Sequence, residues 1–247
     1  MSIFATTFST VTRVATALLA QDCYVCGDQC GNDGNAPLCA ACASALPRLP
    51  TACCPVCALP TTDGATCGQC LKDPPHYDAT VAPFVYAFPI EHLVQALKYQ
   101  SRLPLAAWFA LALLKRLKEK TEQSEQAPLG VDCIMPLPLH ALRLKQRGYN
   151  QAMEIARPLA NALAVPLLWE ACLRERHTVP QTSLPWKARG KNVRDAFHCQ
   201  IDLTGKTVAV VDDVMTTGTT LNELARTLKK HGAARVINYV VARTLKQ

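Results

Sequence analysis

The chain has 247 residues, 49% of them hydrophobic and 18% charged, which is typical of a globular protein with a substantial core and favours two domains. The formal net charge is +7, but residues 1–70 sum to −2, so the remainder carries +9. A basic half favours an anionic partner, and composition alone does not choose between nucleic acid and a small pyrophosphate.

Residues 1–22 predict a short amphipathic helix at the N-terminus. Apolar side chains recur there at helical spacing, at Phe4, Phe8, Val11, Ala15 and Leu18. The stretch has no basic start and no small-residue cleavage site, and Arg13 interrupts it. We therefore expect no secretory signal, no membrane span and a cytoplasmic protein.

Ten of the thirteen cysteines lie between positions 23 and 70. Eight of them form four CxxC pairs: Cys23/Cys26, Cys39/Cys42, Cys54/Cys57 and Cys67/Cys70. Two such pairs close a tetrahedron around Zn²⁺, so residues 23–72 predict a double zinc ribbon with two structural zinc ions. Sequential pairing is the simplest assignment; interleaved pairing, competition of Cys53 with Cys54, and a redox dithiol stay open as alternatives.

A second domain is expected over residues 73–247, after a stiff linker at residues 72–75 (KDPP). Residues 79–88 predict a strand. A helix ending near Lys98 and Tyr99 and a longer helix from Pro104 follow. Residues 132–138 then predict a buried strand stopped by prolines, so strands and helices alternate as in a parallel α/β fold.

Residues 143–151 are predicted to form a basic loop at the exit of that strand. Arg143, Lys145 and Arg147 supply three cations, and Gly148 and Asn150 favour a loop. Because ligands of open α/β sheets bind at the carboxyl ends of the strands, these cations are expected near residues 212–220, where they would neutralise a leaving group. A solvated helix face is the alternative for each of them.

The polar segment 174–192 is expected to form a mobile lid. Its periodicity is weak, and it carries an excess of cations that includes Arg189. Such a lid would close over phosphates and exclude water, while an ordinary surface loop is the alternative.

Residues 207–221 have the order of a phosphate site. A β-branched strand at 208–211 leads into Asp212 and Asp213, then into a Thr/Gly turn, and apolar residues from Leu221 onward repeat at helical spacing. The turn therefore lies at a helix N-terminus, where unpartnered N–H groups and the helix dipole attract an anion. Two carboxylates beside that anion need a hydroxylated or electropositive partner, such as a ribose diol with a divalent cation.

This segment resembles the phosphoribosyl-pyrophosphate signature of the type I phosphoribosyltransferases. By that resemblance, Asp212 and Asp213 form the catalytic pair that holds the ribose hydroxyls, with Mg²⁺ as cofactor. The 5-phosphate is cradled by Thr216, Thr217, Gly218, Thr219 and Thr220. The full set predicted to bind phosphoribosyl pyrophosphate adds Arg143, Lys145, Arg147 and Arg189. An ordinary Asp-Asp strand end before a Thr/Gly turn is the alternative.

The motifs taken in order are similar to the ComF family, including GntX proteins. They are the CxxC quartet, LKDPP, LKY, MPLPLHALRLKQRGYNQA, R-x-x-x-T-x-x-Q and VDDVMTTGTT, and they extend from Cys23 to Thr244. The resemblance implies an N-terminal double zinc ribbon joined to a type I phosphoribosyltransferase-like α/β domain, a parallel sheet flanked by helices. It also implies a role in DNA uptake or use in competent bacteria.

Two functional hypotheses remain at this point, because no acceptor for a phosphoribosyl group is visible in the sequence. The first is a phosphoribosyltransferase. The second is a non-catalytic adaptor or single-stranded DNA-binding module that works with a DNA-uptake helicase.

Overall fold

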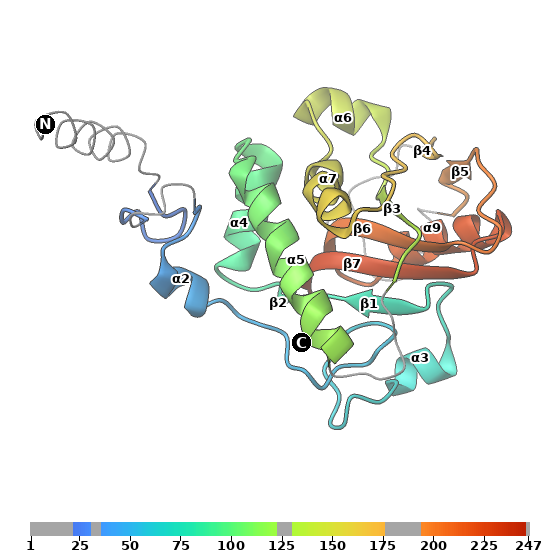
Figure 1. The fold of residues 1–247 in the computed structure, drawn as a ribbon, viewed down its shortest axis with the longest axis horizontal. Helices are drawn as coiled ribbons and strands as arrows, with labels where there is room; N and C mark the ends of the chain where they lie inside the picture. Colours follow the sequence, from blue (N-terminus) through green and yellow to red (C-terminus); the bar gives the residue numbers. More distant parts are fainter. Residues whose placement is uncertain (1–21, 31–35, 123–129, 176–193, 246–247) are drawn as a thin grey trace, which may run out of the picture. The chain divides into compact units, whose positions relative to one another are not determined.

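The computed structural model describes residues 22–30, 36–122, 130–175 and 194–245 (Figure 1). Nearly all of the predicted N-terminal helix and most of the predicted lid, with Arg189, lie outside these residues. The chain divides into two compact units, Met1–Leu46 and Pro47–Gln247. The second cysteine quartet therefore belongs to the same unit as the sheet, and the domain boundary expected after residue 72 stays a prediction.

The larger unit is built on a five-stranded sheet in which every described pair of strands is parallel (Figure 1). Its order is β1-β7-β6-β3, and β2 also pairs with β7. The strands are β1 (Ala79–Val81), β2 (Phe84–Val85), β3 (Cys133–Pro136), β6 (Thr207–Met215) and β7 (Arg235–Arg243). The single strand expected at residues 79–88 is thus two short strands, separated by residues 82–83, where Pro83 has no N–H group to donate.

Helices pack on both faces of this sheet. Alternate side chains of β6 point to opposite faces, and Val208 and Val210 share a buried cluster with Leu221 and Leu224 of α9 (Thr219–Lys230). α5 (Pro104–Glu122) and α7 (Gln151–Leu163) pack on each other and on the sheet. The remaining elements are α3 (Gly68–Lys72), α4 (Ile90–Tyr99), α6 (Ala141–Arg147) and an antiparallel pair, β4 (Cys172–Arg174) with β5 (Phe197–Cys199).

The strand register leaves the end of β6 uncovered on one side. β3 pairs with β6 from Cys133 opposite Val208 to Pro136 opposite Val211, and then stops. β6 continues to Met215, paired only with β7. The strand predicted at 208–211 is therefore longer than expected, and it includes Asp212 and Asp213. These are the first two residues of β6 beyond its last pair with β3.

The smaller unit holds the short helix α2 (Ala40–Ser44), which begins after Cys39. In the described part of the chain, no helix is both long and apolar enough to span a bilayer.

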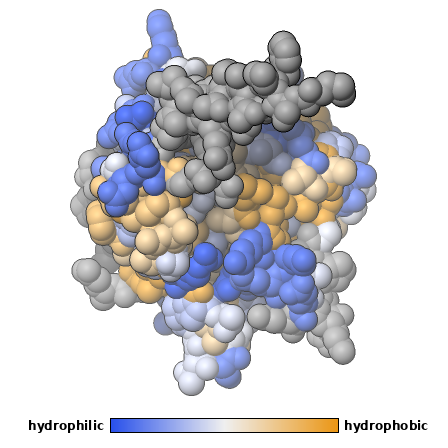
Figure 2. All heavy atoms as spheres, turned by 60° about the vertical axis from the view of Figure 1, so that its left-hand side comes forward, coloured by the Kyte–Doolittle hydropathy of each residue, from blue (hydrophilic) through white to orange (hydrophobic). Residues whose placement is uncertain are grey.

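One face of the molecule shows apolar areas interrupted by hydrophilic ones (Figure 2), and the exposed large hydrophobic residues include Phe88, Leu111 and Trp169.

Helix α5 offers a matched test of the core. Leu113 is fully buried, whereas Leu111 is 64% exposed. Leu113→Ala is expected to lower the free energy of unfolding by about 2–5 kcal/mol through lost burial and a residual cavity, and Leu111→Ala by less than about 0.5 kcal/mol. Urea denaturation of zinc-loaded protein measures both, and equal losses would contradict this packing of α5.

Candidate functional site

Two carboxylates are buried at the end of β6. Asp212 is 8% exposed and Asp213 3% exposed. Their side chains accept hydrogen bonds from the next backbone N–H groups, Asp213 N to Asp212 Oδ1 and Val214 N to Asp213 Oδ1, each at 2.8 Å. Burial, followed by the charge of Asp213, raises the pKa of Asp212 well above its ordinary value. The pair therefore favours a cationic or hydroxylated partner.

Lys98, at the end of α4, supplies one such cation. Its Nζ lies 2.5 Å from Asp213 Oδ2. Burial by itself lowers the pKa of Lys98, but the Asp213 carboxylate outweighs it and the net shift is upward, so the lysine is charged. The Tyr149 hydroxyl donates to the Leu97 carbonyl and ties this end of α4 to the turn that precedes α7. Sequence analysis missed Lys98, although the LKY motif contains it.

The Thr/Gly turn after β6 has the geometry expected from the sequence. Gly218 is the N-cap of α9, with φ 78°, and Thr219 and Thr220 begin the helix. The Thr217 and Thr219 hydroxyls are 2.7 Å apart, and Thr219 N–H donates to Thr217 Oγ1. The first N–H groups of a helix have no intrahelical acceptor, so this turn presents donors and the positive end of the α9 dipole.

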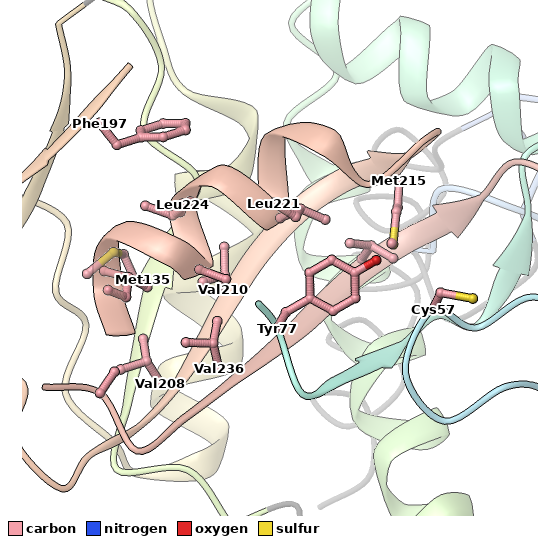
Figure 3. Packing of buried hydrophobic residues seen from close by; sticks show 14 of the residues in the cluster. Cys57, Tyr77, Met135, Phe197, Val208, Val210, Met215, Leu221, Leu224 and Val236 are labelled. Atoms are coloured by element: carbon pink, nitrogen blue, oxygen red, sulfur yellow. The ribbon is translucent and has the colours of Figure 1, made fainter. Parts of the chain in front are cut away.

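Gly218 has a backbone conformation and a crowded surrounding that both favour glycine. A Cβ atom there would lie 2.6 Å from Met215 Cε and 3.0 Å from Tyr77 Oη. Figure 3 shows Tyr77, Met215 and Leu221 close together in this cluster. The positive φ strains any other residue here, and a side chain would also have to displace the end of Met215 and press on Tyr77, so the position favours glycine.

The prediction of a loop at residues 143–151 is wrong. Residues 141–147 form the helix α6, and Gly148, at φ 85°, ends it. Asn150 caps the next helix by accepting from Ala152 N–H, and its Nδ2 donates to the Leu137 carbonyl at the exit of β3. Glycine and asparagine are thus a helix stop and a helix start.

Helix α6 presents two of its three cations to one cavity. Arg143 and Arg147, four residues apart, line a cavity of about 330 Å³ together with Lys98 and Tyr99. Lys145 is exposed and does not line it. Burial, then the neighbouring Arg147, lowers the pKa of Arg143, so two cations crowd this space.

Arg174, at the end of β4, adds to the positive charge near the carboxylates. Burial and then Arg143 lower its pKa, while Asp212 opposes both. The sequence placed Arg174 at the start of the lid without a role in binding. Its proximity to Asp212 depends on how β4 packs, which no local pattern encodes.

A second, larger cavity of about 820 Å³ lies beside the Thr/Gly turn. Its lining includes Thr216–Thr219 and Asn222 from the turn and α9, and Cys57, Cys70 and Arg243 from elsewhere in the larger unit.

Each cysteine quartet brings its four sulfur atoms together. Cys23, Cys26, Cys39 and Cys42 form one cluster, and Cys54, Cys57, Cys67 and Cys70 the other, with all sulfurs of a cluster within 4.8 Å of one another. The sequential pairing is therefore confirmed. Cys53 is outside its neighbouring cluster, because its thiol donates to the Pro50 carbonyl.

The quartets fit Zn²⁺. Two sulfurs that bind one zinc at about 2.3 Å in a tetrahedron lie roughly 3.8 Å apart. The Sγ atoms of Cys26 and Cys39 are 3.8 Å apart, and those of Cys57 and Cys67 are 3.6 Å apart. Backbone N–H groups of Cys42 and Cys67 donate to Cys39 Sγ and Cys54 Sγ, as in zinc knuckles. All-cysteine sites have no open position, so these zinc ions are structural.

Comparison with known proteins agrees with both the α/β sheet and the cysteine quartets. The phosphoribosyl transferase domain family matches residues 149–247, and the double zinc ribbon domain family matches residues 14–71. The DNA utilization protein YhgH of Escherichia coli strain K12 is 35% identical over 86% of this chain and 92% of its own. Competence protein F of Haemophilus influenzae is 34% identical over 72% of this chain and 78% of its own.

A solved purine phosphoribosyltransferase from Pyrococcus horikoshii is also similar, at 20% identity and a TM-score of 0.32, over 67% of this chain and 87% of that one. The type I phosphoribosyltransferase-like parallel sheet and the N-terminal double zinc ribbon expected from the sequence are thus confirmed, on the strength of the domain families, the parallel sheet and the two quartets.

Purified protein is expected to contain about two zinc ions per chain, because metal binding and folding of such ribbons are linked. Cys54→Ser should reduce this to about one, since it removes a ligand of the second quartet. The adjacent Cys53→Ser should leave it at about two, because Cys53 lies outside the quartet. Metal analysis by mass spectrometry distinguishes these results, and equal zinc loss in both variants would contradict the ligand assignment.

Asp212→Asn is expected to raise the free energy of unfolding of ligand-free protein at about pH 7.5. The pKa of Asp212 is raised in the folded state, so the native protein binds this proton more tightly than the unfolded chain does. Stability from this group therefore falls as pH rises from about 4 through the folded pKa, whereas asparagine stays neutral throughout. Denaturation across this pH range measures the change.

Asp202→Asn is the control for that experiment. Hydrogen bonds from Thr204 lower the pKa of Asp202, so its stabilising contribution is present above the unfolded pKa and lost as pH falls. The control should therefore change stability in the opposite direction. A lower or unchanged stability of Asp212→Asn would contradict the buried carboxylate pair.

Proposed function

The chain belongs to the ComF family, and from that membership we propose that its α/β unit binds phosphoribosyl pyrophosphate with Mg²⁺ and transfers the phosphoribosyl group. One observation carries the proposal: two buried carboxylates at the end of β6 are followed, within five residues, by a helix N-terminus whose Gly218 has a positive φ that favours glycine. Carboxylates and an anion site at this spacing suit a ligand with a diol at one point and a phosphate at the next.

The 5-phosphate is assigned to the turn at Thr216–Thr220. The helix dipole of α9, its first N–H groups and the threonine hydroxyls supply donors there. Asp212 and Asp213 would accept hydrogen bonds from the ribose hydroxyls. Their oxygens are also the hard ligands that Mg²⁺ takes together with substrate phosphates, so the donor set fits this ion, which would withdraw charge into the pyrophosphate.

The pyrophosphate is assigned to the cavity lined by Lys98, Arg143 and Arg147. In the transfer, the bond from ribose C1 to the pyrophosphate oxygen breaks, pyrophosphate leaves with the electron pair, and a nucleophile forms the new bond to C1. The three cations would stabilise the charge that develops on the leaving oxygen. Arg189 and Lys145 stay predictions for this subsite, Arg189 because it lies outside the described residues and Lys145 because it is exposed.

The relatives give the cellular setting of this proposal. Their names refer to DNA utilization and to competence, and they match most of this chain. We therefore assign the protein to the uptake or use of DNA, with a DNA-uptake helicase as the partner. Eight of its thirteen cysteines form the two quartets that fit zinc, a use of cysteine that is typical of proteins in a reducing compartment such as the cytoplasm.

A single-stranded DNA-binding adaptor is the second candidate, favoured by one surface feature. The Tyr99 ring is 73% exposed, and the Arg147 guanidinium lies 5.3 Å from its centroid. An aromatic ring framed by cations is the arrangement on which unpaired bases stack. The +9 charge of residues 71–247 adds a sequence-independent attraction to the backbone.

Asp212→Asn combined with Asp213→Asn is expected to lower the affinity for phosphoribosyl pyrophosphate by at least about thirtyfold, since each lost contact costs about 1–3 kcal/mol. Calorimetry with Mg²⁺ present measures this affinity. Asp132→Asn is the matched control, because Asp132 accepts from Thr207 N–H at the opposite end of β6, and its affinity should stay within about twofold. Wild-type affinity in the double variant would overturn the phosphoribosyl assignment.

An oligonucleotide titration at two salt concentrations separates the two candidates. Binding that weakens steeply with salt and depends on Tyr99 would support the adaptor. Tight, Mg²⁺-dependent binding of phosphoribosyl pyrophosphate, together with oligonucleotide binding that does not depend on Tyr99, would support the transferase.

A further inference from the structure

The Cys54–Cys57 knuckle of the second zinc quartet is hydrogen-bonded to the sheet. Three successive carbonyls of the CPVC knuckle, those of Pro55, Val56 and Cys57, all accept hydrogen bonds from buried groups. Thr80 N–H donates to Pro55 at 3.0 Å, Thr80 Oγ1 to Val56 at 2.6 Å, and Arg243 Nε to Cys57 at 2.8 Å. Thr80 is on β1 and Arg243 on β7, so two strands hold the knuckle.

Arg243 also holds the start of the phosphate turn. Its Nη1 donates to the carbonyls of Met215, at 3.0 Å, and Thr216. The residue is only 4% exposed, and burial lowers its pKa, while the Cys57 thiolate opposes that shift. One buried guanidinium thus bonds a residue that binds zinc and the first residue of the Thr216–Thr220 turn.

Tyr77 fills the space between the same two parts. It is 5% exposed, and Figure 3 shows its ring beside Met215 and Cys57, with the hydroxyl directed toward Met215. Its hydroxyl approaches Gly218 from behind, and Cys57, Cys70 and the turn line a common cavity. The back of the turn is therefore connected, through Tyr77 and Arg243, to a knuckle whose shape depends on zinc.

We propose that Arg243 is a positioning residue that couples zinc binding at Cys54, Cys57, Cys67 and Cys70 to anion binding at Thr216–Thr220. The proposal rests on the function proposed above and adds Arg243 and the second zinc quartet to the residues on which ligand binding depends. Zinc binding fixes the position of the Cys57 carbonyl, which in turn orients the Arg243 guanidinium. The guanidinium then holds the carbonyls of Met215 and Thr216 in place. Because linkage is reciprocal, a bound ligand at the turn should also slow zinc loss from this quartet.

The first test removes each zinc in turn. Cys67→Ser with Cys70→Ser is expected to weaken binding of phosphoribosyl pyrophosphate by about fivefold to a hundredfold, the usual range of such coupling. Cys39→Ser with Cys42→Ser is the control, because its zinc belongs to the other compact unit, and its affinity should stay within about twofold. Equal affinities in wild type and in the Cys67/Cys70 variant would overturn the coupling.

The second test addresses Arg243 in protein that keeps both zinc ions. Arg243→Met is expected to weaken ligand binding as the Cys67/Cys70 variant does, and the two changes combined should weaken it no further. In wild type the ligand should slow zinc transfer from the second quartet to a chelator, and in Arg243→Met it should not. Arg235→Met, an exposed arginine on the same strand, should behave as wild type. Additive losses, or ligand-protected zinc in Arg243→Met, would overturn the role of Arg243.

Amide hydrogen exchange separates this proposal from the proposed function. Exchange at residues 215–220 should rise in Arg243→Met and in the Cys67/Cys70 variant, and not in the Cys39/Cys42 or Arg235 variants, with no ligand present. If the variants show this exchange pattern but the wild-type protein does not bind phosphoribosyl pyrophosphate, the proposed function alone is overturned. Unchanged exchange in both variants would overturn the coupling alone.

Discussion

The burial of two adjacent carboxylates at the end of β6 is the constraint around which the rest of the larger unit is arranged. A carboxylate away from water is costly unless it gains a cation, hydrogen bonds or a proton. Asp213 gains the Lys98 ammonium, and both carboxylates gain backbone N–H groups. Arg143, Arg174 and the N-terminus of α9 add positive potential from three further elements. A site so polarised is prepared for a ligand that carries both hydroxyls and phosphates.

The second zinc quartet is part of this same structure. The Pro55 carbonyl accepts from Thr80 N–H as a neighbouring strand would, and the Cys57 carbonyl accepts from the Arg243 side chain, so the quartet closes one side of the core. Cys54, Cys57 and Cys70 belong to the buried cluster that also contains Val208 and Leu224. The family of double zinc ribbons groups both quartets, whereas packing groups the second quartet with the sheet.

Local patterns in the sequence were sufficient where one segment carries the whole feature. The strand, carboxylates, turn and helix of residues 207–230 follow one another without interruption, and CxxC spacing identifies the eight cysteines that the structure gathers. Lys98 and Arg243 escaped notice because their partners are more than twenty residues away: Lys98 meets Asp213, and Arg243 meets Cys57 and Met215. Helix α6 was mistaken for a loop because Gly148 and Asn150, read as loop residues, are its stop and the cap of the next helix.

The strand order has a consequence for how the protein is made. β7 is the last strand of the sheet in sequence, yet it lies inside it, bonded to β1, β2 and β6. On the ribosome, β1 and β2 therefore have no partner in the sheet until β7 is made, and pairing across more than 150 residues, as between Ala79 and Ile237, is slow to find. The second quartet has its four thiols by residue 70 and can take up metal early, but its anchor at Arg243 arrives with β7. Until then β1 and β2 lack their sheet partner, and unpaired strand edges of this kind are prone to aggregate.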